Sequence, residues 1–396
     1  TALLRNISAR AKKRREGKKR PTQKESIALQ GCWEEMKMER VYNFAAGPAT
    51  IDPSVLEKAQ KELVCYQDKG MSVMEMSHRS AMYLDIYNET EALLRQLMGI
   101  PENYKVLFLQ GGATLQFSAV PLNLMGEKNT ADYADTGNFA HLAAKEAKKY
   151  GEVRIAASSR EDGYTFIPRQ FDWNPDAAYA YITTNNTIYG TRFTKLPETG
   201  DVPLVADISS CILSEPIDVS RFALLYAGAQ KNMAPAGLTV VIIREDLIGH
   251  ARDITPTMFN YQTHADNDSM YNTPPCYTIY IAGLVLKWIK EEMGGLEAMK
   301  AYNEKKAGLL YDFLDSSKLF RGTVVKEDRS LMNIPFVTGT EELDAKFVKE
   351  AAAAGFVNLK GHRTVGGMRA SIYNAMPIEG VEKLVAFMRE FEKANG

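Results

Sequence analysis

The sequence has few of the residues that build disulfides and metal sites. Its 396 residues include only four cysteines and five histidines. The cysteines are Cys32, Cys65, Cys211 and Cys276. They are far apart and match no metal-ligand spacing, so we expect free thiols in a reducing compartment, no bound metal and a cytoplasmic location.

Long hydrophobic runs and a large net charge are also absent. No apolar run approaches the roughly 20 residues of a membrane span, so we expect no association with a membrane. The formal net charge is −1, with 45% hydrophobic and 24% charged residues. Those values are ordinary for a globular chain of one or two domains with a large core.

Positive charge is concentrated at the N-terminus, where residues 1–31 hold ten Lys or Arg and two Glu. A basic segment without helical periodicity is typical of a disordered tail, and a nucleic-acid-binding tail or a transit peptide would have this composition. The folded pattern begins only at Arg40. We therefore favour an added or upstream extension with a start near Met36 or Met38, expect residues 1–37 to be disordered, and predict no nucleic-acid binding.

Strand and helix patterns alternate through the middle of the chain, which predicts an α/β fold with a mostly parallel sheet. The expected strands are 105–109, 130–134, 152–156, 178–183, 203–206, 223–226 and 238–243. The expected helices are a run from Pro53 to Gly70, 81–98, one from the Gly111 turn to about 124, and 138–150. The first of these would place Val55, Leu56, Ala59, Leu63 and Val64 on one face.

The pattern changes after Pro274-Pro275. Helices are expected at 277–293, up to 314, at 341–354 and at 378–393, with strands near 323–325, 331–336 and 368–372. The last helix would bury Val381, Leu384, Val385 and Met388 on one face. We therefore expect a large domain of residues 53–298 and a smaller α+β domain of residues 38–52 and 299–396.

Two residues that follow apolar strands point to a cofactor. Asp207 ends the run Val202–Ala206, and Lys231 follows the run Phe222–Tyr226. Ligands of α/β sheets bind just past the carboxyl ends of the strands. Pyridoxal phosphate needs an amine for its Schiff base and a carboxylate facing its pyridinium nitrogen. Singly, a capping Asp and a solvated Lys are the commoner interpretations, but the pair favours this cofactor.

Four more segments carry groups that suit a phosphorylated pyridine. Gly111–Thr114 turns a strand into a helix whose first N–H groups would hold a phosphate. Phe139 follows a strand and would stack on a ring, although a core phenylalanine is the alternative. Thr184–Thr187 and Asn272–Pro275 are polar, and the second is also stiff, as expected of a phosphate loop or of a linker.

Arginine and histidine recur together in glycine-rich surroundings. The two pairs are His78-Arg79 and His362-Arg363, and Arg369 follows Gly366-Gly367. Guanidinium groups bind carboxylate and phosphate with two parallel hydrogen bonds. For any single arginine a surface salt bridge is the alternative, but the set predicts a substrate with two or more negative charges.

Four motifs, in order along the chain, resemble the phosphoserine aminotransferase family. They are Ser77-His78-Arg79, Ala227–Asn232, Asn272–Pro275, and Gly361–Arg363 continuing through Gly366–Pro377. The likeness extends from about Val41 to the C-terminus and does not cover residues 1–37. It implies a class-V aminotransferase with the aspartate-aminotransferase-like fold of type I pyridoxal phosphate enzymes. That fold has a large domain with a mostly parallel seven-stranded sheet and a smaller α+β C-terminal domain, and it works as a homodimer with shared active sites.

The resemblance also implies roles for individual residues. Lys231 would bind the cofactor aldehyde and move the proton at the substrate Cα, and Asp207 would keep the pyridine nitrogen protonated. The other implied cofactor-binding residues are Ala113, Thr114, Phe139, Thr187, Gln230, Asn272 and Thr273, the last two from the partner subunit. The implied substrate-binding residues are Arg79 and Arg369 for carboxylate, and His78, His362 and Arg363 for phosphate or side-chain carboxylate. Many members have Trp in place of Phe139, and some have Arg in place of Thr114.

The implied reaction is reversible transamination of 3-phosphohydroxypyruvate with L-glutamate, giving O-phospho-L-serine and 2-oxoglutarate in serine biosynthesis. Use of a related oxo acid of pyridoxine biosynthesis stays open. One alternative is another fold type I enzyme, such as a serine–glyoxylate aminotransferase or a cysteine desulfurase, for which Cys276 is the only nearby nucleophile. A cofactor-free binding protein for phosphorylated amino acids would need the arginines but not Lys231.

Overall fold

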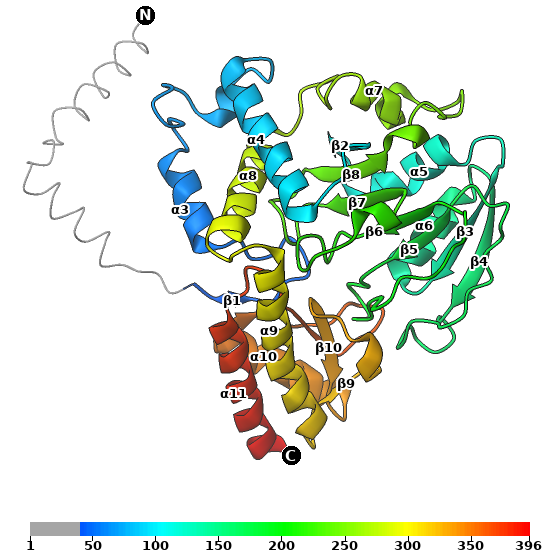
Figure 1. Cartoon of the computed structure of the whole chain (residues 1–396). Coiled ribbons are helices and arrows are strands. Elements are labelled where there is room, and N and C mark those ends of the chain that lie inside the picture. The colour runs from blue at the N-terminus through cyan, green and yellow to red at the C-terminus, as the bar shows by residue number, and fades with distance from the viewer. Residues whose placement is uncertain (1–39) are drawn as a thin grey trace, which may run out of the picture. The chain divides into compact units, whose positions relative to one another are not determined.

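The central element of the fold is a seven-stranded sheet in a computed structural model that describes residues 40–396 (Figure 1). The expectation of disorder in residues 1–37 lies outside these residues. In spatial order the strands are β2 (Tyr104–Leu109), β8 (Thr239–Arg244), β7 (Leu224–Gly228), β6 (Leu204–Asp207), β5 (Ala180–Thr183), β3 (Thr130–Asp135) and β4 (Glu152–Ser158).

Only β8 runs against its neighbours, because it pairs antiparallel with both β2 and β7 while every other adjacent pair is parallel. Strand β2 therefore points the same way as the remaining five. The carboxyl ends of six strands share one edge, which is where α/β sheets bind ligands. The prediction of a mostly parallel sheet is confirmed.

Helices cover both faces of this sheet, and alternate strand residues contact opposite layers. Val106 and Phe108 join the cluster of α3 (Pro53–Lys61), α4 (Ala81–Met98) and α8 (Cys276–Glu291). Leu107 and Leu109 join the cluster of α5 (Gly112–Leu124), α6 (Asn138–Ala147) and α7 (Tyr261–Ala265). Figure 1 shows α4 and α8 side by side on one of these faces.

A third buried cluster is formed by the C-terminal part of the chain together with Phe44. Its elements are β1 (Tyr42–Asn43), β9 (Arg321–Gly322), β10 (Asn333–Val337), β11 (Phe356–Val357), β12 (Met368–Ser371), α10 (Glu341–Ala353) and α11 (Ile378–Asn395). On α11, Val381, Leu384 and Met388 are buried and Val385 packs against them, which confirms the expected apolar face.

Helix α9 (Leu296–Ser316) belongs to two of the clusters. Leu296 and Met299 pack with α8 in the sheet cluster, whereas Ala307 and Leu310 pack in the C-terminal cluster. Residues 42–396 accordingly form one compact unit.

The expected helix from Pro53 to Gly70 is wrong in its second half. Helix α3 ends at Lys61, and Leu63 and Val64 are 40% and 81% exposed. The buried Glu62 carboxylate accepts a hydrogen bond from Tyr280 of α8. This hydrogen bond fixes the chain at the end of α3, so the apolar periodicity beyond Lys61 does not continue as a helix.

The strand expected near 323–325 lies earlier, at β9, and α7, β1 and β11 were not expected.

The packing of α8 on α4 depends on Gly283. A Cβ atom there would lie 2.6 Å from the hydroxyl oxygen of Thr90, which itself donates to the Ile86 carbonyl at 2.8 Å. We expect Gly283→Ala to lower the free energy of unfolding by about 1–3 kcal/mol, as overpacking does. Denaturant unfolding measures the change.

Gly308 of α9 is the matched control, because a Cβ atom there meets nothing within 4 Å. Gly308→Ala should raise stability by about 0.5–1 kcal/mol, since alanine is the better helix former. Equal effects of the two substitutions would show that the close approach at Gly283 does not govern this packing.

Candidate active site

Five of the strands that share an edge end at, or a few residues before, a candidate site residue predicted from the sequence. Strand β2 leads into the Gly111 turn, β3 into Phe139, β5 into Thr187, β6 ends at Asp207, and β7 leads into Lys231. Parallel pairing and the reversal at β8 bring these ends together. The sheet therefore gathers an amine, a carboxylate, a hydroxyl, an aromatic ring and a helix start.

Asp207 is buried at the end of β6, with 6% of its surface exposed. Its carboxylate accepts the backbone N–H of Ser209 at 2.8 Å. Burial raises the pKa of Asp207 above its ordinary value, and the nearby Lys231 charge acts in the opposite direction. A carboxylate held this way is stabilised by a cationic partner, such as a protonated pyridine nitrogen.

Lys231 lies opposite this carboxylate and is partly buried. Its Nζ donates to the Thr187 hydroxyl at 2.8 Å and lies 5.4 Å from the centre of the Phe139 ring. Burial lowers the pKa of Lys231 to about 8, with Asp207 raising it and Arg369 lowering it further. A lysine with a depressed pKa is neutral more often near pH 7, which is the form that attacks an aldehyde.

Helix α5 begins without a capping side chain. Its N-cap Gly111 has a φ of 91°, and a Cβ atom there would meet Leu115 at 2.3 Å. The first N–H groups of the helix, at Ala113 and Thr114, are thus left for an anion. Ala113 is partly buried and Thr114 is exposed.

A cationic group lies on the other side of Lys231. Arg369 of β12 donates to the Thr187 carbonyl at 3.1 Å, while its Nε is buried without a partner among residues 40–396. Burial lowers the pKa of His362, and the charges of Arg369 and Arg363 lower it further. The charges of Arg369 and Arg363 thus both act on His362, and the Nε donor of Arg369 is left for an anion.

Gln230 directly precedes Lys231 in the sequence. Its carbonyl oxygen accepts a hydrogen bond from the backbone N–H of Ala49 at 3.0 Å. The remaining expected residues are not joined to Lys231 by a contact within the described part of the chain. Arg79 and Thr273 are exposed, and His78 and Asn272 are partly buried. Gln110, next to the α5 turn, donates to the Thr273 carbonyl at 3.1 Å.

Sequence reasoning missed several supporting residues. One is Ser209, whose backbone N–H donates to Asp207 at 2.8 Å; a residue two positions after an Asp is where an Asx turn donates, so a local signal was present. Tyr226 pairs with Asp207 in the sheet, and its hydroxyl lies 2.7 Å from that of Tyr181. No spacing in the sequence signals this buried pair of hydroxyls.

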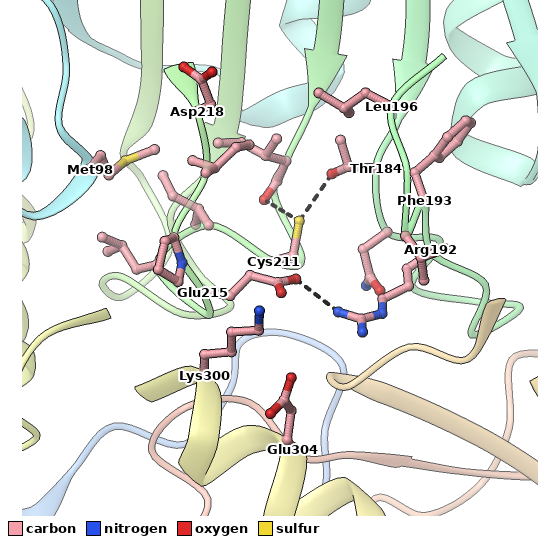
Figure 2. Close-up of a pocket in the computed structure, with 17 residues that line it drawn as sticks. Met98, Thr184, Arg192, Phe193, Leu196, Cys211, Glu215, Asp218, Lys300 and Glu304 are labelled. Atoms are coloured by element: carbon pink, nitrogen blue, oxygen red, sulfur yellow. Dashed lines mark hydrogen bonds and ion pairs between the residues drawn. The ribbon is translucent and has the colours of Figure 1, made fainter. Parts of the chain in front are cut away.

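A cavity of about 340 Å³ lies beside the loop that follows Asp207 (Figure 2). Cys211, which lines it, is 3.0 Å from the Thr184 hydroxyl, and Arg192 pairs with Glu215 at 2.9 Å. Burial raises the pKa of the Cys211 thiol to about 12, and it raises the pKa of Cys276 too. Neither thiol is activated, which argues against the nucleophile that a cysteine desulfurase requires.

Comparisons with known proteins agree on one family. The model for "Aminotransferase class-V" matches residues 41–384. Phosphoserine aminotransferase of Bacillus cereus is 56% identical over 360 residues, covering 90% of this chain and 100% of the relative. The chain therefore belongs to the class-V aminotransferases and, within them, to the phosphoserine aminotransferase family. The resemblance inferred from the motifs is confirmed.

Solved structures of the family have the same fold. The phosphoserine aminotransferase from Bacillus circulans subsp. alkalophilus matches with a TM-score of 0.88 and 51% identity, over 90% of this chain and 99% of that chain. The enzyme from Trichomonas vaginalis, solved with PLP bound, matches with a TM-score of 0.85 and 39% identity, over 88% and 100%. The expected aspartate-aminotransferase-like architecture is confirmed.

The described residues fit pyridoxal phosphate, the cofactor that this family membership implies. The uncapped start of α5 suits its phosphate, the Asp207 carboxylate suits its ring nitrogen, and Lys231 suits its aldehyde.

Among residues 40–396, none of the helices has the length and hydrophobicity of a membrane span.

The charges around Lys231 predict opposite shifts in its titration. The rate at which the cofactor-free protein takes up pyridoxal phosphate should rise as pH increases through about 8, because the neutral amine reacts. Asp207→Asn removes a charge that raises the pKa of Lys231, so the midpoint should fall by about 1 unit. Arg369→Met removes a charge that lowers it, so the midpoint should rise.

Absorbance at each pH measures this uptake. Arg321→Met is the control, because Arg321 is exposed on β9, away from the site, and its midpoint should not move. Shifts of the same sign in the Asp207 and Arg369 variants would contradict the electrostatic account.

Proposed function

We propose that this chain is a pyridoxal phosphate-dependent transaminase that interconverts 3-phosphohydroxypyruvate and L-glutamate with O-phospho-L-serine and 2-oxoglutarate. The observation that carries the proposal is the Lys231–Thr187–Arg369 arrangement. The amine donates to the Thr187 hydroxyl, and the guanidinium donates to the carbonyl of the same residue. The group that would hold the cofactor and the group that would hold the substrate are thus fixed on one residue.

Each residue contributes a distinct step. When bound, pyridoxal phosphate supplies an electron sink that weakens the Cα–H bond of the amino acid. The Lys231 amine, which donates to the Thr187 hydroxyl, would take the proton from the substrate Cα and deliver it to C4′ of the cofactor. The Asp207 carboxylate would keep the pyridine nitrogen of the cofactor protonated. Phe139, whose ring centre lies 5.4 Å from Nζ of Lys231, would limit the position of the cofactor ring.

The substrates explain the cationic group. Both amino donors carry an α-carboxylate and a second anion at the far end. We assign the α-carboxylate to Arg369, whose charge acts on Lys231, and the distal phosphate or carboxylate to His362 and Arg363. A related phosphorylated oxo acid of pyridoxine synthesis has the same two anions and is a further candidate.

A specificity measurement tests this function. With 2-oxoglutarate as acceptor, the purified protein should have a kcat/KM for O-phospho-L-serine well above those for L-serine and L-aspartate. Serine lacks the distal anion that His362 and Arg363 would bind, and the side-chain carboxylate of aspartate carries less charge and lies closer to Cα than the phosphate does. Lys231→Ala is the negative control and should lose turnover, because it removes the reactive amine. Equal rates with serine and phosphoserine would overturn the assignment.

Arg363→Ala tests the distal anion site in the same assay. It should reduce kcat/KM for phosphoserine by about ten- to a hundred-fold, and the rate with alanine much less, because alanine carries no distal anion. Arg321→Ala, at an exposed arginine outside the site, should change neither. Equal losses with both substrates would remove Arg363 from phosphate binding.

We also propose a homodimer in which His78, Arg79, Asn272 and Thr273 of one subunit complete the site of the other. Two facts support it. These residues form no hydrogen bond with Lys231 within residues 40–396, and apolar side chains near them in the sequence are exposed, with Met74 at 58% and Tyr271 at 49%. Light scattering should give twice the chain mass of 44.2 kDa. A monomer with full activity would contradict shared sites.

Two further expectations stand as proposals. The three clusters support a large domain of residues 53–298 and a small domain of residues 38–52 and 299–396. Limited proteolysis that never separates these parts would count against this division.

The free thiols Cys65, Cys211 and Cys276 support a cytoplasmic location, which cell fractionation tests.

A further inference from the structure

Lys306 of α9 is an unusual residue because its charge is fully buried. None of its surface is exposed, and no carboxylate within residues 40–396 pairs with it. Lysine is almost never buried completely unless it is paired, since the ammonium then loses its hydration. Nothing in the proposed reaction uses Lys306, so its retention in the core needs another explanation.

Backbone carbonyls take the place of the missing carboxylate. Nζ of Lys306 donates to the carbonyl oxygens of Tyr373 at 2.8 Å, Met376 at 3.2 Å and Asn374 at 3.4 Å. It also lies 4.7 Å from the centre of the Tyr302 ring. An ammonium has three N–H donors, and three acceptors are present. The geometry therefore holds a protonated lysine, although burial lowers its pKa.

These carbonyls belong to one turn, which connects β12 to α11. Arg369 lies on β12, a few residues before the turn. The Asn374 side chain accepts from Asn303 of α9 at 2.9 Å and donates to the Leu213 carbonyl at 2.8 Å. The turn is thus fixed on one side by two residues of α9, at the point where this helix passes from one core cluster to the other.

On its other side the same turn holds the Lys231 loop. The backbone N–H of Asn374 donates to the side-chain oxygen of Asn232 at 3.0 Å. Asn232 is 7% exposed and directly follows Lys231. A continuous path of hydrogen bonds therefore runs from the buried ammonium of Lys306, through the turn, to the neighbour of the reactive lysine.

We propose that Lys306 is a positioning residue for Lys231, acting through Asn374 and Asn232. By fixing the 373–376 turn it sets the place of the Lys231 loop and the end of the strand that carries Arg369. The inference rests on the proposed function, because the consequence is catalytic. A displacement of about 1 Å at a reacting group costs up to a hundred-fold in rate.

The test is a double-mutant cycle on the holoenzyme, with Lys306→Met and Asn232→Ala. Methionine keeps the length and apolar stem of lysine and removes all three donors. Each single variant should lower kcat by roughly ten-fold with little change in KM, because the chemistry and not the binding of substrate is affected. The double variant should be no worse than either single one, since both break the same path.

Visible circular dichroism of the bound pyridoxal phosphate gives an independent readout of its orientation. It should change alike in both single variants. Lys306→Gln retains two N–H donors and should restore part of kcat and of the dichroism. Lys305→Met is the control: Lys305 is the exposed neighbour on α9, and its loss should leave both readouts unchanged.

Three outcomes would overturn the inference. In the first, Lys306→Met lowers only the unfolding temperature, with kcat and dichroism intact, so that the residue is structural. In the second, the kcat losses of the two single variants multiply in the double variant, so that the residues act separately. In the third, Lys306→Met is unfolded while Lys306→Gln folds with unchanged kcat. In each case the wild-type protein can still transaminate phosphoserine, so failure of the Lys306 inference would leave the proposed function intact.

Discussion

The site depends on the burial of two opposite charges at neighbouring strand ends. Asp207 is buried and Lys231 is partly buried, and burial moves their pKa values in opposite directions. Each charge offsets part of the desolvation of the other, since Lys231 lowers the pKa of Asp207 and Asp207 raises that of Lys231. The parallel pairing of β6 with β7, which puts Asp207 beside Tyr226, creates this situation. Thr187, Phe139 and Arg369 then fill the remaining space around the amine.

Much of the fold could be predicted from the sequence, because the strands of the central sheet are short apolar runs that lie close to where periodicity puts them. The helix at 81–98 begins at a Ser80 cap and ends at Gly99, and both signals are local. The helix from Pro53 failed beyond Lys61 because Glu62 is anchored by Tyr280, which is distant in sequence. The reversed direction of β8 was not predicted either, since strand direction is set by the chain's path rather than by composition.

The candidate site divides in the same way. Lys231, Asp207 and the α5 turn follow strands directly, so their place at one edge follows from the general rule for α/β sheets. The roles of Arg369 and His362 came from a family resemblance, because they lie on the C-terminal layer and no local pattern relates that layer to the sheet. The Tyr181–Tyr226 pair and Lys306 were missed, since their functions exist only in three-dimensional contacts, whereas Ser209 lies two residues after Asp207 and has a local signal.

The uncapped start of α5 has a thermodynamic consequence. In α5 no capping side chain accepts a hydrogen bond from the first N–H groups, and the positive end of the helix dipole faces no capping acceptor. The folded chain therefore leaves part of its possible stabilisation unrealised until an anion arrives at Ala113 and Thr114. Capture of the phosphate group and consolidation of the fold are then one event, so cofactor supply and the lifetime of the protein are linked through the same few amides.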